Sequence, residues 1–344
     1  MIKIEGNLYD KVILVTGGAG FIGSHLVEHF VRKYPNYFII NYDVLTYAAN
    51  PEENLKSILN DTSITNYRGY KDDICNRESL EKLFKTYCVS DVIHLAAESH
   101  VDNSIKDPLI FVRTNVIGTC TLLDVCREFW KDDYSKHRFH HVSTDEVYGA
   151  LDMNPENKFH EYTPYNPHSP YSASKASSDH FVRAYHDTYG MNVTLSNCSN
   201  NFGTHQHSEK MIPHSIKRLM ENKPITIYGD GKNVRDWLYV EDHVKAIDLI
   251  FHKAKSGETY NIGGNHEMNN NQLVQSIIDS YNEITGNHYT FDEVTTRVED
   301  RKGHDLRYAI DSSKLQNELG WKADASHFNE NMKKTVLYYI NLNK

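Results

Sequence analysis

Short runs of β-branched and aromatic residues alternate with longer segments of helical periodicity through the first half of the chain. Residues 12–16 (VILVT) are apolar and lead into glycines, a pattern typical of a parallel strand that is buried on both faces. Further elements of the same two kinds follow, with strands predicted at 38–42, 91–95, 139–143 and 193–197 and helices at 24–33, 78–87, 114–130 and 171–189. This alternation predicts an α/β fold of the Rossmann type, a doubly wound parallel sheet with crossover helices.

Beyond residue 200 the sequence changes to loops rich in His, Asn and Pro. Short strands are predicted there at 225–228 and 259–262, and surface helices at 272–283 and 328–341. The sequence contains no low-complexity linker that would tether a separate unit. We therefore expect a smaller C-terminal α/β substrate domain that is interleaved with the sheet domain. The expected bounds are 1–200 plus about 225–262 for the sheet domain, and about 201–224 plus 263–344 for the substrate domain.

Three glycines lie between the first long strand and its helix. Gly17, Gly20 and Gly23 have the spacing GxxGxxG, which allows a tight turn and a close approach of a pyrophosphate to a helix N-terminus. Asp43 follows 20 residues beyond Gly23 at the end of the next strand, where a carboxylate can bind an adenosine ribose and repel a 2′-phosphate. Glycines also close ordinary turns, but this strand–turn–helix context predicts an NAD site.

Tyr171 and Lys175 open a predicted helix that follows Pro170. Their i,i+4 spacing places the phenol and the ammonium on one helix face. A neighbouring cation lowers the pKa of a tyrosine, so Tyr171 is a candidate base toward a sugar hydroxyl. The alternative is an incidental surface pair, since tyrosine and lysine are both plentiful in this sequence.

Two adjacent acids, Asp145 and Glu146, follow the strand predicted at 139–143. Neighbouring residues on a strand face opposite ways, so both can enter one site only where the strand breaks, which residues 147–149 (VYG) predict. Two close carboxylates disfavour simultaneous ionisation and leave one acid and one base, a pair suited to elimination of water. A solvated acidic turn is the alternative.

Charge and composition restrict the function further. A net charge of −9 over 344 residues argues against a duplex-binding surface. The first ten residues contain no apolar run of the signal-peptide type, and no later stretch reaches about 18 apolar residues. The five cysteines form no CxxC pair, as expected of reduced thiols, so we expect a cytoplasmic protein. His205 and His207 supply fewer ligands than a zinc site needs, so no metal is expected.

Taken together, these motifs resemble the extended short-chain dehydrogenase/reductase family, and within it the dTDP-glucose 4,6-dehydratases. The similarity extends from about Val12 to Trp321. The matching stretches are TGGAGFIGSH from Thr16, LTYAANPEENL from Leu45, HLAAESHVD from His94, STDEVYG from Ser143, YSASKASSDH from Tyr171, NCSNNFG from Asn197, EKMIP from Glu209, RDWLYVEDH from Arg235, YNIGG from Tyr260 and RKGHDLRYAID from Arg301.

The resemblance implies a role for each catalytic candidate. Tyr171, assisted by Lys175, deprotonates the sugar 4-hydroxyl as hydride passes from C4 to NAD. Glu146 then removes the C5 proton, Asp145 protonates the departing C6 hydroxyl, and hydride returns to C6. Thr144 binds the 4-hydroxyl. The product would be a 4-keto-6-deoxy sugar for deoxysugar biosynthesis, that of rhamnose included.

The resemblance also implies the binding residues. NAD would contact Gly17, Gly20, Phe21, Ile22, Gly23, Asp43, Leu45, Thr46, Asp73, Ile74, Leu95, Ala96, Ala97, Thr114, Tyr171, Lys175 and Asn200. The nucleotide sugar would contact Ser99, Thr144, Asn200, Glu209, Lys210, Arg235, Asn270, Arg301 and His304. On sequence alone, Arg235 could instead form an ion pair with Asp236, and Asp73 could be an ordinary loop residue with no binding role. The expected partners are dTDP-glucose or a related nucleotide sugar, and a second copy of the chain joined through helices 114–130 and 171–189.

Other activities remain open at this point. The segment 204–208 (THQHS) lacks the proline and the aromatic residue usual in the family, and residues 44, 49, 271, 272 and 302 also depart from its pattern. A UDP-glucose 4,6-dehydratase, a nucleotide-sugar 4-epimerase or a UDP-glucuronate decarboxylase would share the fold. An epimerase has no use for the Asp145–Glu146 pair. A catalytically inactive NAD-sensing protein would keep the glycines without needing Tyr171 and Lys175.

Overall fold

A parallel sheet forms the centre of the computed structural model, which describes residues 1–300 and 304–343. Its seven strands have the order β12-β8-β7-β6-β3-β4-β5, and all neighbours run parallel, which confirms the predicted doubly wound sheet. The strands are β3 (Lys11–Thr16), β4 (Tyr37–Asp43), β5 (Tyr67–Lys71), β6 (Asp91–His94), β7 (Arg138–Thr144), β8 (Val193–Cys198) and β12 (Thr259–Ile262).

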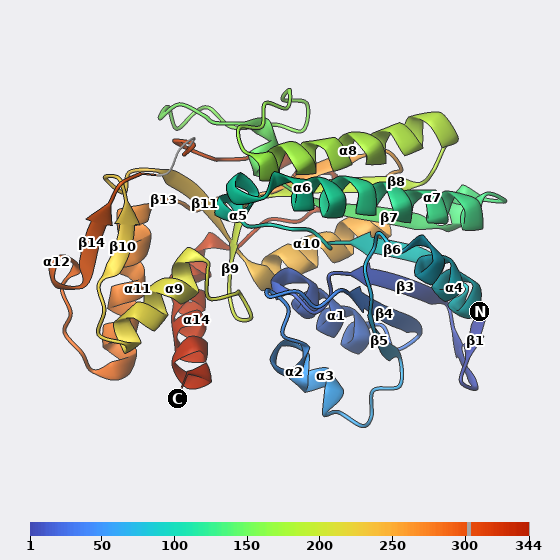
Figure 1. The fold of residues 1–344 in the computed structure, drawn as a ribbon, viewed down its shortest axis with the longest axis horizontal. Helices are drawn as coiled ribbons and strands as arrows, with labels where there is room; N and C mark the ends of the chain where they lie inside the picture. The colour runs from blue at the N-terminus through green and yellow to red at the C-terminus, as the bar shows by residue number, and fades with distance from the viewer. Residues whose placement is uncertain (301–303, 344) are drawn as a thin grey trace.

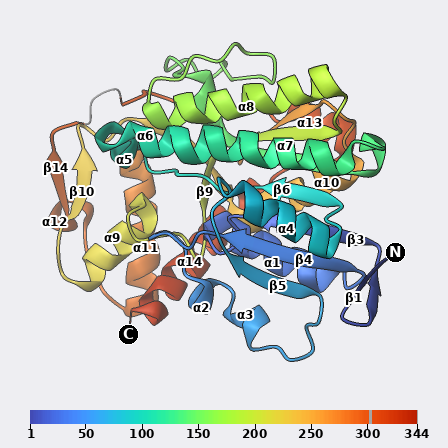
Figure 2. The same ribbon diagram turned by 45° about the vertical axis from the view of Figure 1, so that its right-hand side comes forward.

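Helices cover both faces of this sheet (Figures 1 and 2). Ile13 and Val15 of β3 share one apolar cluster with helices α1 (Phe21–Lys33) and α10 (Val240–Lys253). Val12 and Leu14, the alternate residues of the same strand, share the opposite cluster with α4 (Arg77–Tyr87), α7 (Thr119–Trp130) and α8 (Pro170–Tyr189). A strand with a helix layer on each face needs apolar residues at every position, and the VILVT run meets this condition.

The buried Asp248 of α10 fixes α1 in place. Its carboxylate lies 2.7 Å from His29 Nε2, accepts a 2.6 Å hydrogen bond from Lys33 Nζ and accepts another of 2.8 Å from Tyr34 OH. Burial raises the pKa of Asp248, but the surrounding hydrogen bonds outweigh it and hold this pKa below its usual value. The C-terminal end of α1 is therefore fastened to α10, while its N-terminal end carries the glycine loop.

A second group of elements lies at one end of the sheet, at the left of Figure 1. Its apolar core joins Ile216, Ile277 and Val336 from three helices. The elements are β9 (Asn200–Phe202), α9 (Met211–Met220), β10 (Ile225–Tyr228), β11 (Val234–Tyr239), β13 (Glu267–Asn269), α11 (Asn270–Thr285), α12 (Phe291–Val294), β14 (Thr295–Val298) and α14 (Phe328–Leu342). β11 pairs with both β9 and β13, and β10 pairs with β14.

Shorter elements complete the chain. They are β1 (Ile2–Ile4), β2 (Asn7–Tyr9), α2 (Pro51–Asn54), α3 (Lys56–Leu59), α5 (Val101–Lys106), α6 (Pro108–Phe111), η1 (Val112–Gly118), η2 (Tyr134–Lys136), η3 (Asp145–Tyr148), α13 (Ser313–Leu319) and η4 (Ala325–His327). Among them η1 is a π-helical segment that joins α6 to α7, and η3 is a single 3₁₀ turn directly after β7.

The segment expected to return to the sheet domain, about 225–262, divides between the two groups. β12 joins the central sheet beside β8, and α10 covers one face of that sheet. β10 instead pairs with β14 and packs in the C-terminal core. The division into two domains stays a prediction, but both β10 and β11 of this segment lie outside the central sheet to which the segment was assigned.

The helical stretch Pro108–Trp130 is long and apolar enough to cross a membrane by length and composition, with a mean hydropathy of 1.5. Core helices of globular proteins pass the same test, and 44% of its most apolar window is buried here. α7 packs against α4 and α8, and Gly118 lies directly against Ile74.

Candidate active site

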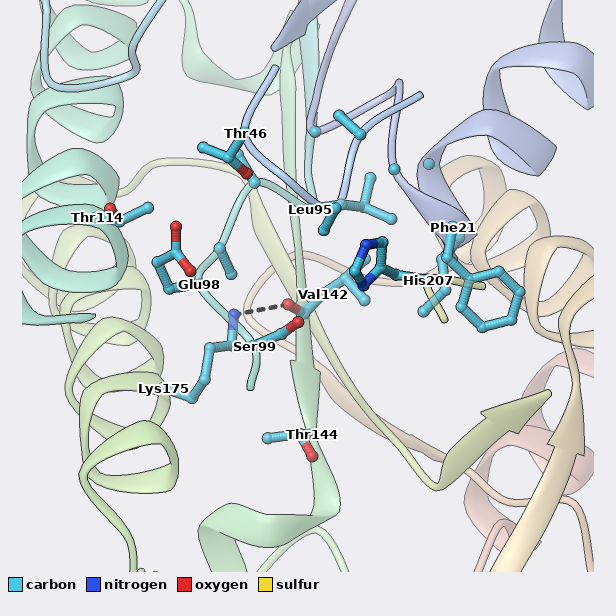
Figure 3. Close-up of a pocket in the computed structure, with 18 of the residues that line it drawn as sticks. Phe21, Thr46, Leu95, Glu98, Ser99, Thr114, Val142, Thr144, Lys175 and His207 are labelled. Atoms are coloured by element: carbon cyan, nitrogen blue, oxygen red, sulfur yellow. Dashed lines mark hydrogen bonds between the residues drawn. The ribbon is translucent and has the colours of Figure 1, made fainter. Parts of the chain in front are cut away.

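A cavity of about 530 Å³ opens at the carboxyl ends of the parallel strands. The chain order of the strands reverses between β3 and β6, and ligands bind at such a switch point in open α/β sheets. The glycine loop, the ends of β4, β6, β7 and β8, and the segment 206–210 line the cavity (Figure 3). Residues far apart in the sequence therefore meet at this edge of the sheet.

The glycine loop is too crowded for side chains at two of its three glycines. A Cβ on Gly17, whose φ is +72°, would lie 2.8 Å from Cα of Ala96. A Cβ on Gly23 would lie 2.1 Å from the Gly17 carbonyl oxygen, whereas a Cβ on Gly20 would meet that oxygen at 3.5 Å. α1 has no side-chain cap and no acid in its first turn, and its first residues line the cavity, as an anion site would require.

Asp43 ties two loops together at the edge of the cavity. Its Oδ2 accepts a 3.0 Å hydrogen bond from the Ala19 amide, and its Oδ1 accepts one of 2.8 Å from the Leu45 amide. Burial raises the pKa of this carboxyl. Each carboxylate oxygen can accept a further hydrogen bond, so this arrangement leaves acceptor capacity for a ribose hydroxyl.

Almost all the predicted NAD contacts line this cavity. Leu45 is the exception, since it offers its amide to Asp43 and lies outside the lining. Asp73 forms a 2.7 Å ion pair with Arg113. The lining includes Gly17, Gly20, Phe21, Ile22, Gly23, Asp43, Thr46, Asp73, Ile74, Leu95, Ala96, Ala97, Thr114, Tyr171, Lys175 and Asn200.

Tyr171 and Lys175 project from the first turns of α8 into the cavity wall. A capping box between Ser169 and Ser172 starts this helix, with Pro170 in its first position. Lys175 Nζ donates a 2.9 Å hydrogen bond to the Val142 carbonyl, as Figure 3 shows. The ammonium is thus directed at β7 rather than at the phenol oxygen.

The environment of Tyr171 differs from the one expected. Burial, and next the charge of Glu146, raise its pKa well above the ordinary value, while a hydrogen bond from Thr144 opposes the shift. The sequence predicted a lowered pKa because Lys175 lies one turn away. That direction was wrong for this structure, because burial outweighs a cation that is turned toward β7.

The strand β7 ends at Thr144, and the 3₁₀ turn η3 brings the two acids to the cavity wall. Thr144 Oγ1 accepts a 3.3 Å hydrogen bond from the Glu146 amide and donates one of 3.4 Å to Asp145 Oδ1. Asp145 is 2% exposed, and its Oδ2 is buried without a hydrogen-bond partner among the described residues. Burial, and then the charges of Glu146 and Asp236, raise its pKa well above the usual range. Burial therefore favours the protonated form of Asp145.

The predicted substrate contacts divide into two sets. Ser99, Asn200, Glu209 and Lys210 line the cavity, together with Thr144. Lys210 Nζ donates a 3.0 Å hydrogen bond to the Ser99 carbonyl across the cavity mouth.

The remaining substrate candidates lie outside the cavity lining. Arg235 lies 4.2 Å above the Tyr308 ring and donates a 3.0 Å hydrogen bond to the Asp305 carbonyl. The alternative ion pair with Asp236 is not formed, since Asp236 accepts backbone amides instead. Asn270 begins α11, and His304 Nδ1 lies 2.6 Å from Asp300. Arg301 is outside the described residues.

Several lining residues were not predicted from the sequence, and three of them are charged or titratable. Glu98 follows β6, and burial followed by the charge of Glu209 raises its pKa. Arg113 reaches the cavity from η1, and His207 enters it from the unusual loop 204–208. The departure of that loop from the family pattern was the one available signal, but it did not indicate which histidine would face the cavity.

The two histidines of this loop face different neighbours. His205 stacks on His25 of α1 with ring centroids 4.5 Å apart, and its Nδ1 lies 3.0 Å from Ser24 Oγ. His207 lies edge-on to Tyr47 at 5.4 Å. Residues 1–300 and 304–343 contain no group of three or more His, Cys, Asp or Glu side chains placed to hold a metal ion.

Comparison with known proteins identifies the family. The family model for GDP-mannose 4,6 dehydratase matches residues 14–335. A dTDP-glucose 4,6-dehydratase from Salmonella typhimurium is 46% identical over 340 residues, which cover 95% of this chain and 92% of the relative. The chain belongs to the dTDP-glucose 4,6-dehydratase family.

Solved structures show the same likeness. A dTDP-glucose 4,6-dehydratase from Streptomyces venezuelae, whose structure contains NAD, matches with a TM-score of 0.86 and 40% identity over 96% of this chain and 97% of that chain. A UDP-glucose 4-epimerase from Thermotoga maritima matches with a TM-score of 0.82 at 29% identity, over 97% and 100% of the two chains. Dehydratases and epimerases of nucleotide sugars thus share this fold.

We predict that Gly23→Ala destabilises the protein by about 1–3 kcal/mol, because the new methyl group would overlap the Gly17 carbonyl. Gly20→Ala is the matched control, since its Cβ would make only an ordinary contact, and its effect should stay within about 0.5 kcal/mol. Urea unfolding of both variants measures the difference. Equal stabilities would show that the crowding at Gly23 relaxes at little cost.

Proposed function

We propose that the chain catalyses the NAD-dependent dehydration of dTDP-glucose to dTDP-4-keto-6-deoxyglucose. The observation that carries the proposal is the pair of acids at the end of β7. Asp145 is buried with a raised pKa, and Glu146 stands beside it on the wall of the cavity that Tyr171 also lines. This pair has a use in elimination and none in simple epimerisation.

The residues around the glycine loop fit a bound NAD. Gly17 and Gly23 leave no room for a side chain, the first amides of α1 face the cavity, and Asp43 retains free acceptor capacity. Phe21 and Ile22 would hold the pyrophosphate through their amides. Bound NAD supplies a hydride acceptor for C4 of the sugar and returns the hydride to C6.

The protein residues then carry the proton transfers. Tyr171 takes the proton of the 4-hydroxyl, with Lys175 as the cation on the same helix face. Glu146 removes the C5 proton, which the new C4 ketone makes acidic. Asp145, whose protonated form burial favours, gives its proton to the departing C6 hydroxyl so that water leaves. Once hydride has returned to C6, Glu146 gives its proton back to C5. Tyr171 then ends protonated and Asp145 ionised, and proton exchange with solvent resets both.

The nucleotide would extend from the cavity toward the C-terminal group of elements. Lys210, Ser99, Asn200 and Glu209 are placed near the cavity mouth, and Arg235, Asn270, His304 and Arg301 are proposed for the diphosphate and the base. A guanidinium suits a diphosphate because its planar fork donates two parallel hydrogen bonds. UDP-glucose is the alternative substrate, since one methyl group on the base contributes only about 1–3 kcal/mol.

The cellular role follows from the product. A 4-keto-6-deoxy sugar nucleotide is an intermediate for deoxysugar biosynthesis, and rhamnose is one such product. The five cysteines are free thiols, as in a reducing compartment, which supports a cytoplasmic location. The sheet domain would hold NAD and the C-terminal domain the nucleotide.

We further propose a homodimer. α7 and α8 lie side by side, and apolar side chains are exposed at Phe181 and Tyr189 of α8 and at Ile117 of η1, which leads into α7. Leu109, just before the same helix layer, is 74% exposed. Exposed apolar side chains on neighbouring helical segments are typical of an interface between two copies.

Proton NMR time courses with dTDP-glucose and UDP-glucose in parallel test the activity. We expect a C6 methyl doublet to appear with no net NADH, and faster with dTDP-glucose. Galactose signals would make the enzyme an epimerase, and unchanged spectra in both tubes would contradict a dehydratase of either nucleotide.

Glu146→Gln should reduce dehydration by at least about 100-fold while C4 oxidation persists, because an amide cannot remove the C5 proton. Absorbance of NADH at the start of the reaction reports the oxidation step, and methyl formation reports dehydration. Glu156→Gln, in an exposed loop, is the control and should behave as the parent protein. If Glu146→Gln lost C4 oxidation and dehydration equally, Glu146 would not be the base that removes the C5 proton.

Phe181→Glu should convert the dimer into a monomer, because it places a charge in the proposed apolar contact. Leu337→Glu, which alters a similarly exposed apolar residue on α14, should leave the dimer intact. Light scattering gives the mass against 39.8 kDa for one chain. A parent protein that is already monomeric would refute the dimer.

A further inference from the structure

A buried carboxylate lies behind the Tyr171–Lys175 pair and has no role in the proposed proton transfers. Asp179 follows Lys175 by one helical turn on α8, and it is 0% exposed. Its neighbour His141 on β7 is also 0% exposed. His141 Nε2 lies 3.1 Å from Asp179 Oδ1 and 3.4 Å from Lys175 Nζ. The imidazole thus stands between an acid and an amine that are both excluded from water.

The hydrogen bonds around Asp179 favour its carboxylate form. Its Oδ2 accepts a 2.8 Å hydrogen bond from Ser143 Oγ and one of 2.9 Å from Tyr165 OH. The Tyr165 oxygen itself accepts from Arg183 and Asn197, whose nitrogens can only donate. Tyr165 must therefore direct its own proton at Asp179. Two donors on one oxygen favour the ionised form.

Burial opposes the charge on both partners. It raises the pKa of Asp179 and lowers the pKa of Lys175. After burial, the strongest influence on the pKa of each residue is the opposite charge of the other residue of this pair. Each ion therefore favours the charged form of its partner.

The other titratable groups around the pair are held neutral by burial. On β6 and β7, burial lowers the pKa of His94 and His141 well below the ordinary value. On β8, it raises the pKa of Cys198 to about 12. The pKa of Tyr165, in the segment before α8, is raised well above its usual value.

Three more charged or titratable residues lie around the Asp179–Lys175 pair. Arg183 donates a hydrogen bond to the Tyr165 hydroxyl, which in turn donates to Asp179, and the charge of Arg183 also acts to lower the pKa of Asp179. Burial raises the pKa of Tyr148, on η3, and the charge of Glu161 adds to that shift. Tyr171 faces the cavity, also with a raised pKa. Within the described part of the chain, Asp179 is thus the carboxylate placed to compensate Lys175.

We propose that Asp179 is a positioning residue, the counter-ion that keeps Lys175 in its ammonium form beside the base Tyr171. The role rests on the proposed function, because it matters only if Tyr171 must lose its proton during the reaction. Lys175 is directed at β7 by the Val142 carbonyl, and Asp179 supplies the negative charge on that same side. Without this charge burial would favour the neutral amine, and Tyr171 would lose the cation one helical turn away.

The pH dependence of kcat/KM in Asp179→Asn tests this role. We expect the limb that reports loss of the Tyr171 proton to move to higher pH by at least one unit, with activity near pH 7 reduced about tenfold and partly recovered at alkaline pH. KM for the sugar nucleotide should stay unchanged, since Asp179 does not line the cavity. A uniform loss at every pH would show a packing role and overturn the proposal.

Tyr165→Phe is the matched control. It removes one hydrogen bond to Asp179 but keeps the charge, so stability should fall while the position of the pH limb is retained. If Tyr165→Phe shifted the pH limb of kcat/KM as far as Asp179→Asn does, the charge of Asp179 would not be the cause.

A second measurement needs neither substrate nor a fragile variant. In the parent NAD-loaded protein with ¹³C,¹⁵N-labelled lysine, the Lys175 resonance is assigned by its absence from Lys175→Arg. We expect an ammonium signal from about pH 6 to about pH 9, near the range of an ordinary lysine. An amine signal at neutral pH would refute the role of Asp179 even if the protein proves an active dehydratase. An ammonium signal without dehydratase activity would instead leave the counter-ion in place and refute the proposed function.

Discussion

The close contact of three backbone segments at the strand switch point is the constraint on which this site depends. Gly17 lies against Ala96 at the end of β6, and Gly23 of α1 lies against Gly17. No side chain fits at either glycine, so α1 can start only where the loop leaves β3. Asp43 ties the same loop to the end of β4, and Asp248 fastens the far end of α1 to α10. The direction of the α1 amides toward the cavity follows from these fixed points.

The other side of the cavity is built on buried charge rather than on close backbone contact. α8 carries Tyr171, Lys175 and Asp179 at intervals of one turn, all facing β7 or the cavity. Isolated charges at such depth would be lost, because burial favours the neutral form of each. They persist as a compensated set with His141 between them. The same low polarity raises the pKa of Asp145. Burial therefore acts on both the proposed acid, Asp145, and the residues around the proposed base, Tyr171.

The two walls differ in what they would tolerate. At the glycine loop the limit is steric, and it applies to any side chain whatever its polarity. Around α8 the limit is electrostatic, so a change that preserves volume but removes one charge alters its partners. The unusual loop 204–208 joins these regions, since His205 rests on α1 and His207 enters the cavity. The departure of this loop from the family pattern therefore changes the cavity wall but leaves Asp145 and Glu146, at the end of β7, unchanged.

Much of the fold was readable from the sequence because its signals are local. Strand β3, the glycine spacing and the break after Thr144 each depend on a few adjacent residues, and the structure places all three as expected. Strand β11 and helix α10 were missed, since their residues gave no clear boundary between strand and helix.

The sequence by itself determined the parallel sheet, the glycine loop and the placing of Tyr171, Asp145 and Glu146 at one edge, because strand ends and helix spacing are fixed by short-range geometry. Only the tertiary structure decided which way Lys175 points, that burial raises the pKa of Tyr171, and that Asp179 and His141 lie behind the pair. Burial and the position of a partner charge depend on segments distant in the chain, and no spacing along the sequence encodes them.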